Sequence, residues 1–218
     1  MVHLLQDMTQ RRSGHILNIL MGAGNIPMNS KKPEITVFAG PNGSGKSTMT
    51  AVSPHRLQPY INADDIKKSN HCSDIEAAEK AEQIRREYVV NKQSFSFETV
   101  LSTDRNILLL KKAKREGYFI RGIFVLTNSV ELNVLRVIAR HQNGGHNVPA
   151  DKIRSRYDKS LANLPEFIEL CDVCHVYDNT GQGPCRIFKK KRNEITYWTT
   201  QYWTKSKISK LVRIAFDA

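Results

Sequence analysis

The sequence contains one complete pattern of the type G-x-x-x-x-G-K-[ST], formed by Gly40, Gly45, Lys46 and Ser47 in the stretch AGPNGSGKST. Glycines let successive backbone N–H groups curl around a phosphate, and the start of a following helix adds its dipole. The lysine of such a loop reaches the outer phosphates of a nucleoside triphosphate, and the next hydroxyl ligates Mg²⁺. An ordinary glycine-rich turn is the alternative, but the apolar run before the loop argues against it. The stretch therefore predicts a triphosphate site with Ser47 as metal ligand, made by Gly40, Pro41, Asn42, Gly43, Ser44, Gly45, Lys46, Ser47 and Thr48.

Acidic residues end two other β-like stretches. Asp64 and Asp65 end QPYINADD, and Glu98 with Thr99 lies near the end of SFSFETVL. Ligands of an open parallel sheet bind beyond the carboxyl ends of its strands, where the phosphate loop and these acids would all fall. A carboxylate at that edge can accept the proton of a hydroxyl that attacks a phosphate. These residues and a bound ATP with Mg²⁺ are the parts of a small-molecule kinase.

A cationic stretch between residues 128 and 157 is too charged to form part of a core. Gly144 and Gly145 interrupt it, and Pro149 suits the first turn of a second helix. The pattern predicts a helical lid over about residues 130–158 that brings cations over a transferring phosphate. A solvated pair of basic helices is the alternative. The side chains concerned are Arg136, Arg140, His141, His146, Lys152, Arg154 and Arg156.

These side chains must be positioned by the alternating β-like and helical patterns of the rest of the chain. About five strands are predicted, at residues 35–39, 58–65, 94–101, 118–126 and 173–179. Helices are predicted after the capping box Ser73-x-x-Glu76 and over residues 104–116. Such alternation implies right-handed crossovers, so the predicted fold class is α/β, with a mostly parallel sheet in a three-layer arrangement.

Two of these elements carry more specific expectations. If the strand at 58–65 persists through Asp65, its side chains alternate, and only one of Asp64 and Asp65 faces the crevice. The helix after Ser73 is predicted to bury one apolar face and to expose a charged one. The apolar set is Ile75, Ala78, Ala81, Ile84, Tyr88 and Val89, and the charged set is Glu79, Glu82, Arg85 and Arg86.

Composition bounds the class of molecule. A chain of 218 residues suits one domain with a real core, here residues 31–218, with an N-terminal extension over 1–30. A net charge of +12 predicts anionic partners, which include nucleotides, sugar phosphates, RNA and acidic proteins. No apolar run reaches the length of a membrane span, so we expect a cytoplasmic protein without a membrane partner. Near the end we expect a strand with a basic turn over 186–192 and a core-covering helical tail over 195–215.

The chain has four cysteines, and Cys171 and Cys174 form a C-x-x-C pair. If residues 173–177 form a strand, positions three apart point to opposite faces, so these two thiols are not expected to converge. No second pair completes a tetrahedral set. We therefore predict reduced, mostly buried thiols, with metal binding as the alternative.

Several pieces of the chain together resemble the zeta toxins, which are P-loop kinases of bacterial toxin–antitoxin systems. The pieces span about residues 35–179 and are AGPNGSGKST, YINADDI, SFSFETVLST, and RHQNGGHNVPADKIRSRYDKSLANL running into VYDNT. The resemblance implies a three-layer P-loop kinase fold with ATP and Mg²⁺ as donor. It also implies UDP-N-acetylglucosamine, a nucleotide sugar, as acceptor, and phosphorylation of its sugar hydroxyl would poison cell-wall synthesis. An antitoxin protein is the partner that it suggests.

The resemblance also implies roles for individual residues. Asp64 is similar to the family's catalytic base, with Asp65 beside it as the alternative, and Glu98 is similar to its substrate-binding acid. Arg140 and one of Arg154 or Arg156 correspond to the lid arginines. The predicted catalytic set is Asp64, Lys46, Arg140 and Arg156, and the predicted substrate-binding set is Glu98, Thr99, Asp65, His146 and Arg154.

Three functions follow from the sequence. The first is a zeta-like kinase of a nucleotide sugar that acts as a toxin. The second keeps the kinase and replaces the acceptor with another small metabolite, without toxicity. The third is a basic, NTP-dependent RNA-binding protein, which we place last because no RNA-binding motif is present and two anionic substrates already account for the charge. Nucleic acid is therefore not an expected partner.

Overall fold

The computed structural model describes residues 32–144 and 148–216. The extension predicted over residues 1–30 and the predicted substrate residue His146 lie outside these ranges. Among the described helices, none is both long and apolar enough to cross a bilayer.

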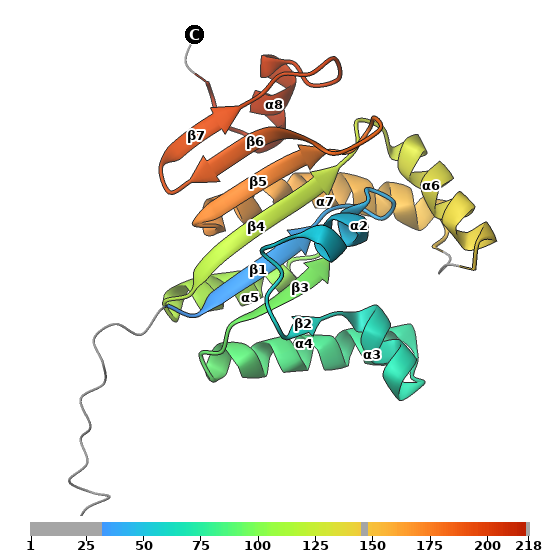
Figure 1. Cartoon of the computed structure of the whole chain (residues 1–218), viewed down its shortest axis with the longest axis vertical. Coiled ribbons are helices and arrows are strands. Elements are labelled where there is room, and N and C mark those ends of the chain that lie inside the picture. Colours follow the sequence, from blue (N-terminus) through green and yellow to red (C-terminus); the bar gives the residue numbers. More distant parts are fainter. Residues whose placement is uncertain (1–31, 145–147, 217–218) are drawn as a thin grey trace, which may run out of the picture. The chain divides into compact units, whose positions relative to one another are not determined.

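The described part of the chain is built on a seven-stranded sheet of order β2-β3-β1-β4-β5-β6-β7 (Figure 1). The first five strands in this order run parallel, and β6 and β7 continue the sheet antiparallel. All five predicted strands occur, which confirms the α/β class. The strands are β1 (Glu34–Ala39), β2 (Tyr60–Ile61), β3 (Phe95–Thr99), β4 (Phe119–Leu126), β5 (Val173–Asp178), β6 (Cys185–Lys191) and β7 (Glu194–Tyr197).

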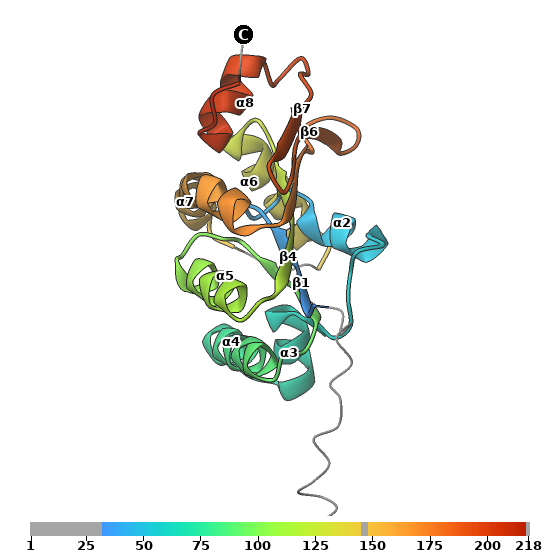
Figure 2. The same cartoon turned by 90° about the vertical axis from the view of Figure 1, so that its left-hand side faces the viewer.

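Helices cover the two faces of the sheet unequally (Figure 2). One face packs on α4, α5, α7 and α8 through a large apolar cluster that includes Ile35, Phe97 and Phe167. The other face meets α2 through a small cluster of Phe38, Ile123 and Val125. The helices are α2 (Lys46–Val52), α3 (Ala63–Asn70), α4 (Asp74–Val90), α5 (Arg105–Arg115), α6 (Val130–Gln142), α7 (Ala150–Leu170) and α8 (Lys205–Val212).

The strand predicted over residues 58–65 is wrong at its C-terminal end. Only Tyr60–Ile61 pairs with β3, and Asp64 and Asp65 lie in the first turn of α3. The helix begins here because Asn62 caps it. The backbone of Asn62 is extended, and its side chain accepts a hydrogen bond from the Asp64 amide at 3.1 Å. Side-chain alternation along a strand therefore does not separate the two aspartates.

Helix α4 confirms its predicted start and most of its predicted apolar face, since Ala81 and Val89 are buried and Ile84 and Tyr88 pack against the core. Ser73 and Glu76 exchange both hydrogen bonds of the capping box. The positions that are buried are Ala77, Ala81, Arg85 and Val89, whereas Ile75 is 72% exposed. Ala77 is buried in place of the predicted Ala78, and the Arg85 guanidinium packs over the Phe97 ring. Arg85, predicted to be solvated, faces inward.

The predicted helical tail over residues 195–215 is also wrong in part. Residues Glu194–Tyr197 form β7, which pairs with β6 through a turn at Arg192, and α8 begins only at Lys205. The Thr204 side chain accepts a hydrogen bond from the Lys207 amide at 3.3 Å and so caps α8. Trp203 is buried as expected for a core-covering segment.

The cysteine pair differs from the expectation as well. Cys171 and Cys174 are both buried, and the two thiols lie close enough for Cys174 to raise the pKa of Cys171. Cys171 ends α7 and precedes the strand, so strand alternation does not apply to it. Burial raises the pKa of the Cys171 thiol, and no disulfide joins the four cysteines. Within residues 32–144 and 148–216, no group of three or more His, Cys, Asp or Glu side chains is arranged to hold a metal ion.

Candidate active site

The phosphate loop connects β1 to α2 and needs glycine for steric reasons. Gly40, Gly43 and Gly45 all have positive φ, at 140°, 78° and 91°. A Cβ on Gly43 would lie 2.4 Å from the Asn133 carbonyl oxygen of α6, and one on Gly40 would lie 2.0 Å from the Val125 carbonyl oxygen. The loop is therefore pressed against β4 and α6, with a backbone path that only glycine permits.

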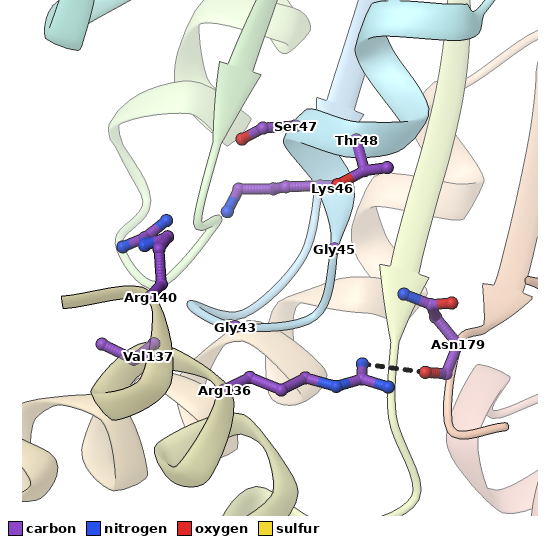
Figure 3. Close-up of a pocket in the computed structure, with 9 residues that line it drawn as sticks. All are labelled: Gly43, Gly45, Lys46, Ser47, Thr48, Arg136, Val137, Arg140 and Asn179. Atoms are coloured by element: carbon purple, nitrogen blue, oxygen red, sulfur yellow. Dashed lines mark hydrogen bonds between the residues drawn. The ribbon is translucent and has the colours of Figure 1, made fainter. Parts of the chain in front are cut away.

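The loop lines a cavity of about 350 Å³ that fits a phosphate group. Two polar atoms of the loop, Ser44 Oγ and Asn42 Oδ1, are buried and have no hydrogen-bond partner among the described residues. Buried polar atoms are normally hydrogen-bonded, so these two are available to a ligand. Figure 3 shows the residues that line this cavity, with the Lys46 side chain extending toward Arg140. They are Gly43, Gly45, Lys46, Ser47, Thr48, Arg136, Val137, Arg140 and Asn179.

Lys46 lies where the charged groups of the site meet. Burial lowers the pKa of its ammonium, and the nearby Arg140 guanidinium lowers this pKa further. The carboxylates of Glu98 and Asp64 act in the opposite direction. The charges of two carboxylates and of Arg140 therefore lie close enough to Lys46 to change its pKa. This agrees with the prediction that these groups meet at the carboxyl edge of the sheet.

Glu98 faces the start of α2 rather than open solvent. Ser47 Oγ donates a hydrogen bond to Glu98 Oε2 at 2.8 Å, and the Tyr60 side chain lies close enough to Glu98 for the carboxylate to act on its hydroxyl. Burial, followed by the charge of Glu98, raises the pKa of Tyr60. A hydroxyl and a carboxylate side by side are the hard oxygen ligands that Mg²⁺ prefers, so Ser47 and Glu98 fit a magnesium ion and its bound water.

A second cavity, of about 460 Å³, joins the phosphate loop to the inner side of α4, and we call it the α4 cavity. It brings together most of the predicted site, because Lys46, Ser47, Asp64, Glu98, Thr99, Arg140 and Arg156 all line it. The predicted substrate residue Asp65 is not among them. Its side chain lines a separate hollow of about 280 Å³ beside Tyr60 and Ile66.

The two candidate lid arginines have different surroundings. Arg154 is exposed and donates two hydrogen bonds to the Glu131 carboxylate, both at 2.9 Å. Arg156 is half-buried and lines the α4 cavity. The geometry thus brings Arg156, rather than Arg154, to the site. Thr99 lines the cavity too, but its hydroxyl accepts hydrogen bonds from Leu101 and Asn106 and so shapes the loop after β3.

The sequence did not predict how two residues hold the phosphate loop: Asn179 was not singled out, and Arg136 was named only as a cation of the lid. Asn179, which directly follows β5, donates from Nδ2 to the Ser44 carbonyl oxygen at 2.8 Å. Arg136 on α6 donates to the Asn179 carbonyl oxygen at 2.9 Å, as the dashed line in Figure 3 shows. Asn179 sits at the carboxyl edge of a strand, the position where the sheet-edge rule places functional groups, so this signal was available in the sequence.

Comparison with known proteins assigns the chain to a family. The sequence model of the zeta toxin family matches residues 21–193. The chain belongs to the zeta toxin family. The match begins within the segment that the sequence analysis treats as an N-terminal extension, and it includes the phosphate loop, α3, α4 and the lid arginines. An uncharacterised protein of Haemophilus influenzae is 31% identical over 125 residues, which are 55% of this chain and 89% of that protein.

Solved structures share the fold of this zeta toxin family member. One comes from the PezAT chromosomal toxin–antitoxin system of Streptococcus pneumoniae, with a TM-score of 0.57 at 16% identity, covering 94% of this chain and 88% of that one. Another is AvrRxo1-ORF1 with AvrRxo1-ORF2 and ATP, with a TM-score of 0.62 at 14% identity, covering 83% of this chain and 64% of that one. The three-layer P-loop kinase fold is thereby confirmed, and family and fold support an ATP-dependent kinase.

Proposed function

We propose that this zeta toxin family member transfers the γ-phosphate of ATP to a sugar hydroxyl of a nucleotide sugar such as UDP-N-acetylglucosamine. The observation that carries the proposal is the α4 cavity, which is lined both by Lys46 and Ser47 of the phosphate loop and by the carboxylate of Asp64. Phosphoryl transfer requires a donor phosphate and a proton acceptor around one acceptor hydroxyl. Family membership supports the same conclusion.

The residues of the loop would bind and orient the donor. The backbone N–H groups of the glycine-rich turn and the Lys46 ammonium would contact the phosphates, while Asn179 holds the turn through its hydrogen bond to the Ser44 carbonyl. Ser47 would hold Mg²⁺ directly, and Glu98 would accept hydrogen bonds from water on the ion. The ion, when bound, neutralises charge on the phosphates.

Asp64 would be the base, and the lid arginines would stabilise the charge of the transferring group. The acceptor oxygen forms a bond to the γ-phosphorus, the bond from this phosphorus to the β–γ bridging oxygen breaks, and ADP leaves. The proton of the acceptor hydroxyl passes to the Asp64 carboxylate. Arg140 and Arg156 line the same cavity and would face the equatorial oxygens on which charge spreads.

An acceptor panel tests this function. The full chain is incubated with ATP, Mg²⁺ and nucleotide sugars, free sugars or other hydroxyl-bearing metabolites, and each product is examined by mass spectrometry for the gain of one phosphate. We expect UDP-N-acetylglucosamine to gain a phosphate and the Lys46→Ala variant to form none. A gain on a different metabolite alone would favour the second hypothesis, a kinase without a cell-wall target.

Toxicity and an antitoxin partner form part of the same proposal. Structures that share the fold include a protein of the PezAT toxin–antitoxin system, which supports an antitoxin as partner. Expression in a bacterial host should slow growth, and Lys46→Ala should abolish the effect because it removes the charge that holds the outer phosphates. Undiminished killing by a folded Lys46→Ala protein would exclude phosphorylation as the cause.

A further inference from the structure

Arg85 is a buried cation on the inner face of α4. The residue is only 8% exposed, and it follows Ala77 and Ala81 along the buried side of the helix. Taking a guanidinium out of water is costly unless an anion or several hydrogen bonds compensate it. Burial accordingly lowers the pKa of Arg85 to about 10, far below the ordinary value of an arginine.

The compensation expected for such a cation is incomplete among the described residues. Arg85 Nε is buried without a hydrogen-bond partner, and the guanidinium carbon lies 5.0 Å from the centre of the Phe97 ring. The nearby carboxylate of Glu82 is engaged by two exposed arginines instead, Arg86 at 2.5 Å and Arg105 at 3.6 Å. The ring face orients the guanidinium but does not neutralise it.

Arg85 lies where its charge can contact a ligand. Arg85 lines the α4 cavity, the same cavity that Asp64 and Lys46 line. Three alanines of α4, at 77, 78 and 81, also line it, so small side chains border the cavity beside Arg85. The hydroxyl-bearing residues Ser102 and Thr103 complete the polar lining on the β3 side.

We propose that Arg85 binds an anionic group of the acceptor, a phosphate or a carboxylate, inside the α4 cavity. This inference rests on the proposed kinase function and narrows its substrate class to acceptors that carry negative charge. A guanidinium matches two oxygens of one phosphate or carboxylate with two parallel hydrogen bonds, and such bonds strengthen when water is excluded. The diphosphate of a nucleotide sugar satisfies this requirement, whereas a free neutral sugar does not.

The experiment measures acceptor binding separately from donor binding. The full chain is first saturated with Mg²⁺ and a non-hydrolysable ATP analogue, so that the phosphate loop is occupied. UDP-N-acetylglucosamine, inorganic diphosphate and neutral N-acetylglucosamine are then titrated in by calorimetry. The variants are Arg85→Met, which keeps the contact with Phe97 but removes the charge, and Arg86→Met, a matched control on the exposed side of the same helix.

We expect Arg85→Met to bind UDP-N-acetylglucosamine about tenfold to a hundredfold more weakly than wild type, because charged hydrogen bonds are lost. Affinity for the ATP analogue should stay within about twofold, and Arg86→Met should match wild type. If Arg85→Met does not fold, Arg85→Lys keeps the charge without the fork and should still lose at least about fivefold. Equal binding by the Arg85 and Arg86 variants would overturn the inference.

The failure of this inference is distinguishable from the failure of the proposed function. If wild type phosphorylates UDP-N-acetylglucosamine but Arg85→Met binds it unchanged, the anion site is wrong and the kinase stands. If the nucleotide sugar does not bind but inorganic diphosphate binds in an Arg85-dependent manner, the anion site stands and the acceptor is wrong. A wild-type protein that binds neither anionic probe overturns the anion site.

Discussion

The two walls of the α4 cavity are held in different ways. On the loop wall, elements from across the sheet fix each other, because Asn179 after β5 bonds Ser44 and α6 crowds Gly43. On the opposite wall, α3 is short and exposed, and α4 presents alanines and the incompletely compensated Arg85. The loop wall, whose parts hold one another, suits the phosphates of the donor, which are the same in every reaction of this kind. The opposite wall, lined by small side chains, suits the acceptor, which can differ between kinases.

The largest expected effect tests whether Asp64, on the opposite wall, is the base. Asp64→Asn keeps the shape and loses the proton-accepting oxygen, so turnover should fall by about two to four orders of magnitude. Affinity for ATP, which the loop wall sets, should stay near wild type. Asp65→Asn is the control, since Asp65 lines another hollow and this variant should retain most activity. An active Asp64→Asn beside an inactive but folded Asp65→Asn would move the base by one residue.

The next effect concerns the cations that close the cavity from the lid side. Arg140→Ala or Arg156→Ala should lower kcat by about a hundredfold or more if, as proposed, each side chain stabilises charge on the transferring group. Arg154→Ala should change kcat by no more than a few fold, because its partner is the exposed Glu131. Steady-state kinetics of the three variants distinguish them, and wild-type turnover in the first two would remove the lid from the mechanism.

A smaller effect is expected from loosening the loop wall. Asn179→Ala removes the hydrogen bond to the Ser44 carbonyl and should weaken binding of an ATP analogue by about tenfold, while acceptor affinity is unchanged. Asn193→Ala, in the turn between β6 and β7, is a remote control. If Asn179→Ala impaired only the acceptor, the division of the cavity into a donor wall and an acceptor wall would be incorrect.

The smallest expected effect comes from Tyr60, whose side chain interacts with Glu98 beside the phosphate loop. Tyr60→Phe removes the hydroxyl that interacts with Glu98, and Glu98 accepts a hydrogen bond from Ser47. The Mg²⁺ concentration that gives half-maximal rate should rise by a few fold, about the loss of one polar contact, with little change at saturating Mg²⁺. A drop in kcat at saturating Mg²⁺ would instead show that Tyr60 acts on the acceptor.

The same contrast explains what could be predicted from the sequence. The phosphate loop is a local requirement of backbone and charge, so four residues within a short stretch identify it. The Arg85 guanidinium packs over the ring of Phe97 on another element, a contact that no local pattern encodes, and the sequence therefore assigned Arg85 to the solvent side. Asp64 and Asp65 were placed on a strand because the capping by Asn62 was not recognised. The contact of Asn179 with Ser44 joins residues 135 positions apart.

The sheet of the described residues ends in two short strands. β2 contributes two residues at one edge, and β7 contributes four at the other. A strand edge offers unpaired N–H and C=O groups to any other chain, and long edges are where proteins join into aggregates. The two edge strands leave few such groups unpaired, and the β6–β7 hairpin carries the cations Lys191 and Arg192, which we expect to repel the same edge of another copy. We expect the domain to tolerate high protein concentration in low-salt buffers, where this repulsion is strongest.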